Sequence, residues 1–362
     1  MKRILTLILL VSLVLCACGP AQNSGETTLQ TTQETTQETT QETTQETTEA
    51  PVVYYNPLNG EEIDQPYTGR PTAVVINNVR ACLPQYGIGQ ADMIYEFEVE
   101  GSSTRLLAVF SSFDGIETIG PVRSARTFFN NVAVSYDAPL IHCGGSKDAR
   151  AGKYDHNNKI SNWEHIDQTY NGKYFFRDKE RRSKGYALEH TLFTTGEKLI
   201  EGLADKKYNT VTETAKDYGL IFMENPTVVG ESADVVNVKF RAGKVTKMTY
   251  NESTGLYEAY QLKENHIDAG TGERIAYRNV LVLTTKHQII KEGSYPRAYY
   301  DLIGSGEGFF AIGGQIVPIK WSRESLRDSF VYTFADGTPL TLGVGKTYVG
   351  VISNTKGAVT CE

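Results

Sequence analysis

The feature that most limits how this 362-residue chain can fold is a repeat near its N-terminus. Thr-Thr-Gln-Glu occurs four times between Thr31 and Glu46. The surrounding segment, 19–53, holds six glutamates, no Lys or Arg and few apolar residues, so it cannot offset the entropy of ordering. As a coil of about 35 residues, it would reach roughly 30–35 Å. We therefore expect an unfolded tether, with the folded body beginning near residue 54.

The segment before the repeat is typical of an export signal. Lys2 and Arg3 precede an apolar run over 4–15. Such a run spans only about 18 Å as a helix, too short for a bilayer core of roughly 30 Å, so it indicates a signal peptide over 1–17. The following Leu15-Cys16-Ala17-Cys18 resembles the lipobox of bacterial lipoproteins. We predict that Cys18 is lipidated and begins a tether over 18–53. The alternative is a plain signal peptide with unmodified cysteines.

These segments predict an extracytoplasmic protein whose lipid anchor attaches it to the bacterial cell membrane, its first expected partner. The net charge is −7, from 36 Lys and Arg against 43 Asp and Glu, which argues against a nucleic-acid partner. After processing, Cys82, Cys143 and Cys361 remain, which allows at most one disulfide within the chain. Their spacing, and that of the six histidines, gives no indication of a metal site, and we expect no cofactor.

Residues 54–208 alternate strand-like and helix-like patterns, which predicts an N-terminal domain with a mixed α/β sheet and covering helices. A helical stripe runs from Val122 to Tyr136, and Thr194 with Glu197 forms a capping box that opens a second helix. Strands are expected over 72–77, 93–100, 106–110 and 139–142, the middle two as a hairpin.

Residues 225–362 differ in character. Short strands separated by turn residues recur over this segment, and no helix longer than two turns is evident. The pattern predicts an all-β C-terminal domain, either a sandwich or barrel-like. The whole chain is therefore assigned to the α+β class. Nine strands are expected here, over 235–240, 244–250, 257–262, 280–284, 298–303, 308–312, 315–320, 330–334 and 347–352.

The segment GPVRSAR over 120–126 carries the clearest functional indication. Pro121 suits the first position of a helix, which would place Arg123 and Arg126 in its first turn. Cations oppose the positive end of the helix dipole, so a negative group is expected beside them. That group is either an anionic ligand or an internal carboxylate from strand 93–100.

Other polar residues complete the candidate site. Glu96, Glu98 and Glu100 alternate along one strand and are expected to share a sheet face. His142 ends a strand, and its neighbour Cys143 points to the opposite face, which argues against a Cys–His catalytic pair. We predict a ligand-binding site made of Arg123, Arg126, Arg105, Glu100 and His142, and we assign no catalytic residue.

The folded part resembles the YerB-like family of bacterial lipoproteins. The resemblance implies an N-terminal α/β part and a β-rich C-terminal part, with no established reaction and no catalytic residues to transfer. This chain differs from the family pattern at Asn77, where an acid is expected, and at Ser102, where a second glycine is expected. The motifs that carry the resemblance are Arg70-Pro71, 73–78, 91–96, Val99-Glu100-Gly101, Thr104-Arg105, 120–126, His266…Asp268…Thr271-Gly272, 304–306 and Gly337…Gly345.

These features lead to three functional hypotheses. The first is a non-catalytic lipoprotein that binds an anionic envelope ligand or an envelope protein. The second is a cell-envelope hydrolase that uses a carboxylate among Glu96, Glu98 and Glu100 as general acid or base, together with His142. The third, a transporter's solute-binding protein, conflicts with the β-only second half, because such proteins pair two similar α/β lobes.

Overall fold

The computed structural model describes residues 52–146, 163–212, 216–261, 263–292 and 295–362. The predicted signal peptide, Cys18 and the tether lie outside these ranges. Residues Val52–Glu362 belong to one compact unit. Within the described ranges, no helix combines the length and apolar character needed to cross a bilayer.

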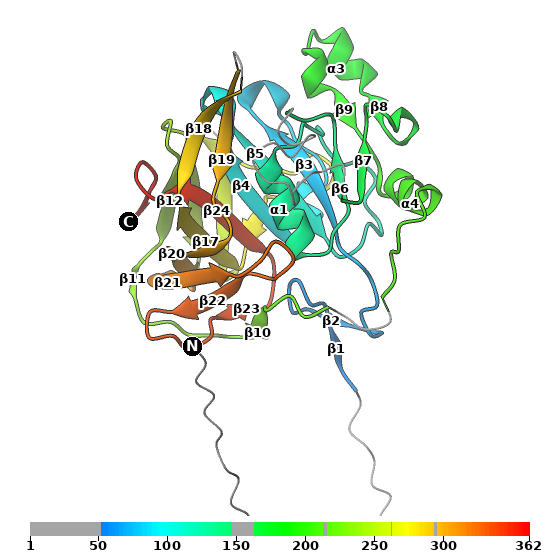
Figure 1. Cartoon of the computed structure of the whole chain (residues 1–362). Helices are drawn as coiled ribbons and strands as arrows, with labels where there is room; N and C mark the ends of the chain where they lie inside the picture. The colour runs from blue at the N-terminus through cyan, green and yellow to red at the C-terminus, as the bar shows by residue number, and fades with distance from the viewer. Residues whose placement is uncertain (1–51, 147–162, 213–215, 262, 293–294) are drawn as a thin grey trace, which may run out of the picture. The chain divides into compact units, whose positions relative to one another are not determined.

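A central sheet of eleven strands, counted over the described residues, runs through this unit (Figure 1). Strand β22 (Val331–Phe334) lies off the main path of this sheet and pairs with the strand over Gln315–Arg323. In spatial order the main path is β11 (Glu231–Ser232), β21 (Gln315–Arg323), β20 (Gly304–Ile312), β17 (Asn279–Thr285), β24 (Thr347–Ser353), β4 (Met93–Glu98), β5 (Thr104–Phe110), β3 (Thr72–Asn78), β6 (Leu140–His142) and β7 (His165–Asp167).

The two predicted segments meet inside this sheet. Strand β24, near the C-terminus, lies parallel to both β17 and β4, and Gly350 pairs with Glu96. Strand β4 also forms the expected antiparallel pair with β5. Strands from both sides of residues 208–225, where the sequence pattern changes, therefore belong to one continuous sheet.

Helix α1 (Thr127–Ser135) covers one face of the central sheet (Figure 1). All nine of its residues are buried. The ring of Phe128 lies 4.8 Å from that of Phe97 on β4 and 5.0 Å from that of Tyr300. Tyr300 belongs to the hairpin of β18 (His287–Glu292) and β19 (Tyr295–Tyr300). Aromatic packing thus joins α1, the sheet and this hairpin.

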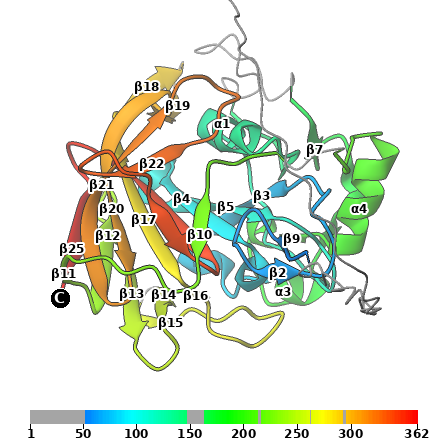
Figure 2. The ribbon, with the colours of Figure 1, turned by 90° about the horizontal axis from the view of Figure 1, so that it is seen from below.

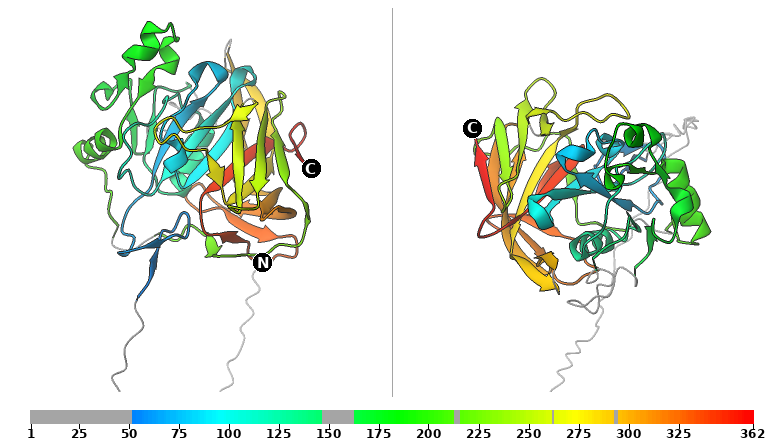
Figure 3. Two further views of the ribbon diagram at one scale, coloured as in Figure 1. Left: turned by 180° about the vertical axis from the view of Figure 1, so that it is seen from behind. Right: turned by 90° about the horizontal axis from the view of Figure 1, so that it is seen from above.

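A second sheet covers the opposite face of the β17–β24–β4 region (Figure 3). Val236, Val238 and Met248 of this smaller sheet pack in the same buried cluster as Ile94 and Val282 of the central sheet. Helix α4 (Gly196–Asp205) contributes Leu199 and Leu203 to that cluster. The smaller sheet consists of β15 (Glu264–Asn265), β14 (Leu256–Gln261), β13 (Val245–Asn251), β12 (Val235–Lys239) and β25 (Ala358–Cys361), with β16 (Ala276–Tyr277) paired to β14.

Short strand pairs and a short α-helix lie around these layers, and the view from below shows several of them (Figure 2). Their buried residues, such as Leu192 and Leu342, join the two buried clusters that the sheets form. These elements are β1 (Tyr54–Tyr55) with β2 (Glu62–Ile63), β10 (Ile221–Met223) with β23 (Thr341–Gly343), β8 (Phe176–Arg177) with β9 (Leu192–Phe193), and α3 (Lys179–Ser183).

The α+β class and the β-rich C-terminal part are confirmed. Two helix starts differ from the prediction. Helix α1 begins at Thr127, because the backbone of residues 120–126 pairs with β3 and with the segments around Leu192 and Gly144. Helix α4 is capped by Thr195 and not by Thr194: the Thr195 side chain accepts from the Lys198 amide, whereas the Thr194 hydroxyl donates to the Tyr174 carbonyl.

Candidate functional site

The arginine motif is an extended segment and not a helix turn, which corrects the sequence prediction. The Arg123 amide donates to the Val75 carbonyl at 2.8 Å, and the Cys143 amide donates to the Arg123 carbonyl at 3.1 Å. The motif therefore lies beside the end of β3. Arg126 occupies the N-cap position before α1. The two guanidinium groups therefore do not both lie in the first turn of a helix, where the helix dipole would repel them.

Arg126 is instead neutralised inside the chain. Its Nε lies 3.0 Å from both carboxylate oxygens of Glu100, and a second nitrogen lies 2.7 Å from Glu100 Oε2. The Ala298 amide donates to Glu100 Oε1 at 3.0 Å. Burial raises the pKa of Glu100, but the hydrogen bonds and charge of Arg126 outweigh burial and lower that pKa overall. The salt-bridge alternative therefore holds for this pair.

Arg123 also has a partner. Its guanidinium lies 3.0 Å from Glu189, which precedes β9. The side chains of Arg123 and Glu189 are 22% and 50% exposed, so this pair is at the rim of the site and is screened by water. Sequence reasoning missed Glu189, because this residue lies outside every motif.

Arg105 differs from the other two arginines. It lies on β5 opposite Asn77, is 8% exposed, and donates to the Ser124 carbonyl at 2.5 Å. No carboxylate among the described residues is within ion-pair distance of Arg105. Burial, followed by the charges of Arg126 and Arg123, lowers the pKa of Arg105 well below its usual value. By contrast, the buried Arg323 reaches three carbonyl oxygens.

We call Arg105, Arg123, Arg126, Glu100 and Glu189 the arginine cluster. It gathers four of the five residues predicted for the ligand site, with three guanidinium groups against two carboxylates. Arg126 and Arg123 are each paired with one of the carboxylates, so the excess positive charge of the cluster belongs to the buried Arg105.

His142, the fifth predicted residue, contacts a different set of groups. Its Nδ1 lies 2.8 Å from the Gly144 carbonyl and 4.0 Å from the Asp167 carboxylate, and its ring packs against His165. The backbone that follows His142 contacts the arginine motif: the Cys143 amide donates to the Arg123 carbonyl, and the Ala125 amide donates to the Gly144 carbonyl.

Cys143 is half-buried, and its thiol donates to the Gln168 side chain at 3.3 Å. Among the described residues, no disulfide joins Cys82, Cys143 and Cys361. The same residues contain no group of three or more His, Cys, Asp or Glu side chains placed to hold a metal ion.

The three glutamates do not share one environment, which corrects the expectation of a common face. Glu96 and Glu98 project between the two sheets and are each 1% exposed, whereas Glu100 lies beyond the end of β4, in the 3-10 helix Glu100–Ser102. Burial raises the pKa of Glu96, but the charge of Lys244 and several hydrogen bonds outweigh burial and lower that pKa.

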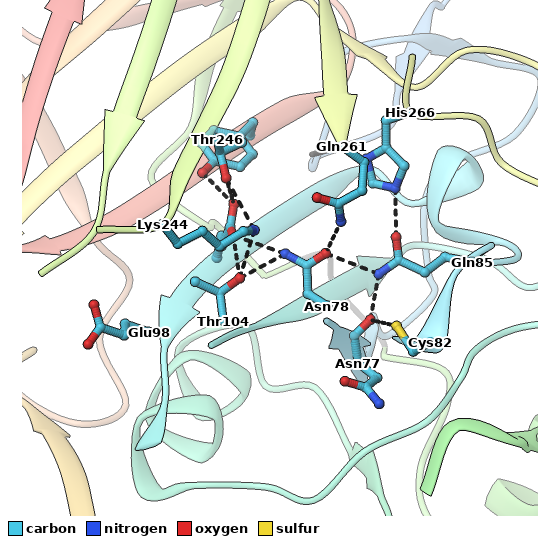
Figure 4. Close-up of polar contacts among 12 residues, drawn as sticks. Asn77, Asn78, Cys82, Gln85, Glu98, Thr104, Lys244, Thr246, Gln261 and His266 are labelled. Carbon is cyan, nitrogen blue, oxygen red and sulfur yellow. Dashed lines mark hydrogen bonds and ion pairs between the residues drawn. The ribbon is translucent and has the colours of Figure 1, made fainter. Parts of the chain in front are cut away.

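Glu96 is the centre of a buried polar network between the two sheets. Figure 4 labels its partners Thr104, Lys244 and Thr246. Lys244 and Thr104 donate to Oε1 at 2.5 and 2.6 Å, while Thr246 and Tyr348 donate to Oε2 at 2.7 and 2.8 Å. Sequence reasoning missed this network, because Lys244 is 148 residues from Glu96 and neither residue is part of a recognisable spacing.

These contacts bear on the hydrolase hypothesis. Glu96 and Glu100 are held as carboxylates, so neither is suited to donate a proton. Glu98 is buried beside Arg241, with Nε 3.4 Å from Oε1, and its Oε2 accepts from the Ala242 amide at 2.9 Å. Glu98 lies on the face of β4 that the smaller sheet covers and is 1% exposed, so its carboxylate is shielded from solvent.

The fold and the motifs together define a class of α+β proteins with an N-terminal part and a β-rich C-terminal part. The chain belongs to the DUF3048 family of proteins of unknown function: the model of its N-terminal domain matches residues 58–209 and that of its C-terminal domain matches residues 236–349.

One relative is "Putative lipoprotein YerB" of Bacillus subtilis (strain 168). It is 27% identical over 304 residues, which cover 82% of this chain and 85% of the relative. The crystal structure of YerB protein from Bacillus subtilis matches with a TM-score of 0.70 at 25% identity, over 84% of this chain and 99% of that one. The resemblance drawn from the sequence motifs is thereby confirmed.

Proposed function

We propose that this protein is an extracytoplasmic lipoprotein, anchored to the bacterial cell membrane through Cys18, that binds an anionic envelope ligand or envelope protein and catalyses no reaction. The export signal, the lipobox-like residues before Cys18 and the name of the YerB relative support the anchor. The arginine cluster is the proposed binding site.

The observation that carries the proposal is the charge of Arg105. A charged group taken out of water costs several kcal/mol unless a counter-charge or several hydrogen bonds compensate for it. Arg105 has one carbonyl partner, and the charges of Arg126 and Arg123 act on it more strongly than the opposing charges of Glu100 and Glu189. A phosphate or carboxylate group at Arg105 would restore charge balance, and Arg123, at the partly exposed rim, would be the first cation it meets.

A carboxylate-based hydrolase has less support. All three candidate glutamates have an ion-pair partner, which is Lys244 for Glu96, Arg241 for Glu98 and Arg126 for Glu100. The Nδ1 of His142 faces the Gly144 carbonyl and the Asp167 carboxylate. We therefore assign no general acid or base and propose no catalytic residue.

Calorimetric titration of the full-length chain in mild detergent tests the site, with inorganic phosphate and acetate as probes. A hydrogen bond to a charged group contributes about 1.5–3 kcal/mol, so Arg105→Met should weaken binding at least about tenfold. Arg182→Met, which removes the same charge from an exposed position on α3, is the matched control and should stay within about twofold of wild type.

Two results would overturn the proposal: no measurable binding of either anion by the wild-type chain, or equal affinity of the wild-type and Arg105→Met proteins. Thermal unfolding of both variants without anion separates loss of the site from loss of the fold.

A further inference from the structure

A polar cleft on another part of the molecule has the features of a second binding site. Its volume is about 370 Å³, and its walls come from segments far apart in the sequence. The 3-10 helix Ile88–Gln90 forms one wall, residues 268–278 form another, and Val344, Gly345 and Lys346 form a third. None of its lining residues belongs to the arginine cluster.

Asp268 fixes the first two walls to each other. Its carboxylate is 1% exposed and accepts from the amides of Gly87, Gly89 and Gly270 at 3.0, 2.7 and 2.8 Å. The side chains of His266 and Gln85 join the same two segments at 2.6 Å (Figure 4). The position of this wall is therefore set by buried hydrogen bonds and does not depend on a ligand.

Glycines make room for Arg278 in the cleft. A Cβ at Gly255 would lie 2.5 Å from a terminal nitrogen of Arg278, and a Cβ at Gly343 would lie 2.9 Å from its Cγ and Nε. Gly345, at φ +130°, has a backbone conformation that other residues rarely adopt. Larger side chains at these positions would displace the guanidinium group.

The cleft contains two cations without an acidic partner. Arg278 donates to the carbonyls of Gly255 and Glu224 at 3.0 and 3.3 Å, and Lys346 donates to the Gly89 carbonyl. Among the described residues, no carboxylate lies within 4.0 Å of the charged atoms of either. Arg274, also in the cleft wall, is by contrast paired with Glu258.

Two acids lie at the mouth of the same cleft. Glu61 and Glu273 both line it and are exposed, whereas Arg278 and Lys346 are half-buried. The buried Asp268 carboxylate in the wall is already bound by three backbone amides, so the charges left for a ligand are the two half-buried cations and the two exposed acids. Such an arrangement attracts a molecule with both charges and repels a polyanion at the entrance.

We propose that this cleft binds an amino acid or short peptide, with the ligand carboxylate held by Arg278 and Lys346 and its ammonium group near Glu61 and Glu273. The volume is at the small end of ligand pockets and suits a molecule of dipeptide size. The charged, hydrogen-bonding walls favour a polar ligand over an apolar one. This site is independent of the arginine cluster.

Calorimetric titration of the full-length chain in mild detergent tests the inference with the dipeptide Ala-Ala, N-acetyl-Ala-Ala and Ala-Ala amide. The unmodified dipeptide should bind best. The amide, which lacks the carboxylate, should bind at least about tenfold more weakly, and the N-acetyl form should also bind more weakly.

Variants assign the contacts. Arg278→Gln and Lys346→Gln should each weaken Ala-Ala binding at least about tenfold, whereas the exposed Lys356→Gln and the cluster variant Arg105→Met should bind it like wild type. The inference is overturned if the wild-type chain shows no binding of Ala-Ala, if the amide or the N-acetyl form binds as well as Ala-Ala, or if Arg278→Gln and Lys346→Gln bind it unchanged. A result from Arg105→Met with phosphate leaves this inference untouched.

Discussion

Replacing Glu96 by Gln tests whether the buried polar network stabilises the packing of the two sheets. The carboxylate accepts five hydrogen bonds, from Lys244, Asn78, Thr104, Thr246 and Tyr348. The amide nitrogen of Gln accepts none of these, so at least two buried donors lose their acceptor, and Lys244 loses its counter-charge.

The expected cost follows from these losses. Removing one partner of a buried ion pair typically costs 3–5 kcal/mol, because the remaining charge stays uncompensated. The Lys244 side chain is 17% exposed, so water recovers part of this loss. We expect Glu96→Gln to lower the free energy of unfolding by about 3 kcal/mol, a large fraction of the 5–15 kcal/mol typical of folded domains.

Urea unfolding followed by the fluorescence of the buried Trp321 measures this change. Glu180→Gln is the control, because Glu180 pairs with Lys184 on the surface, where the two side chains are 76% and 62% exposed. Surface pairs contribute at most about 1 kcal/mol, so this variant should unfold nearly like wild type.

A double variant isolates the pair itself. Glu96→Gln with Lys244→Met removes both charges and should cost less than the sum of the single changes, by about 1–3 kcal/mol. A change below about 1 kcal/mol for Glu96→Gln, or strictly additive single changes, would refute the reasoning.

Two further predictions concern protonation and anchoring. Burial, followed by the charge of Lys244, lowers the pKa of His266 to about 4, below the unfolded value of about 6.5. As the pH falls, the unfolded chain therefore takes up this proton before the folded chain does. The free energy of unfolding should decrease between about pH 6.5 and pH 4. The loss should approach about 3 kcal/mol, and urea unfolding at pH 7 and 4 should show a smaller loss for His266→Gln; an equal loss would contradict the assignment. Cys18→Ala should move the chain from the membrane fraction to the soluble fraction on cell fractionation, while Cys16→Ala should not, and retention of Cys18→Ala at the membrane would contradict the lipid anchor.

Local patterns in the sequence predicted most of the strands. The alternation of Glu and apolar residues over 93–100 predicted a strand, and β4 occupies Met93–Glu98 of that range. The same alternation does not tell whether the glutamate face meets water or is covered by another part of the chain. Here the smaller sheet covers Glu96 and Glu98 and supplies their counter-charges.

The helix start near Pro121 was wrong for a related reason. Pro at a first helical position is a local preference, whereas residues 120–126 gain backbone hydrogen bonds to β3 and to residues around Leu192 and Gly144. Tertiary pairing therefore outweighed the local signal, and Arg123 and Arg126 separated to different acidic partners.

The sequence by itself determined where the chain can fold, because the apolar content and charge of a segment fix whether burial can offset the entropy of ordering. It also determined the strand pattern and the α+β class, since side-chain period is a local property. Only the tertiary structure decided which charges meet. Asp268 contacts Gly89 across 179 residues, and the cleft beside them is formed by backbone pairing that no local spacing encodes.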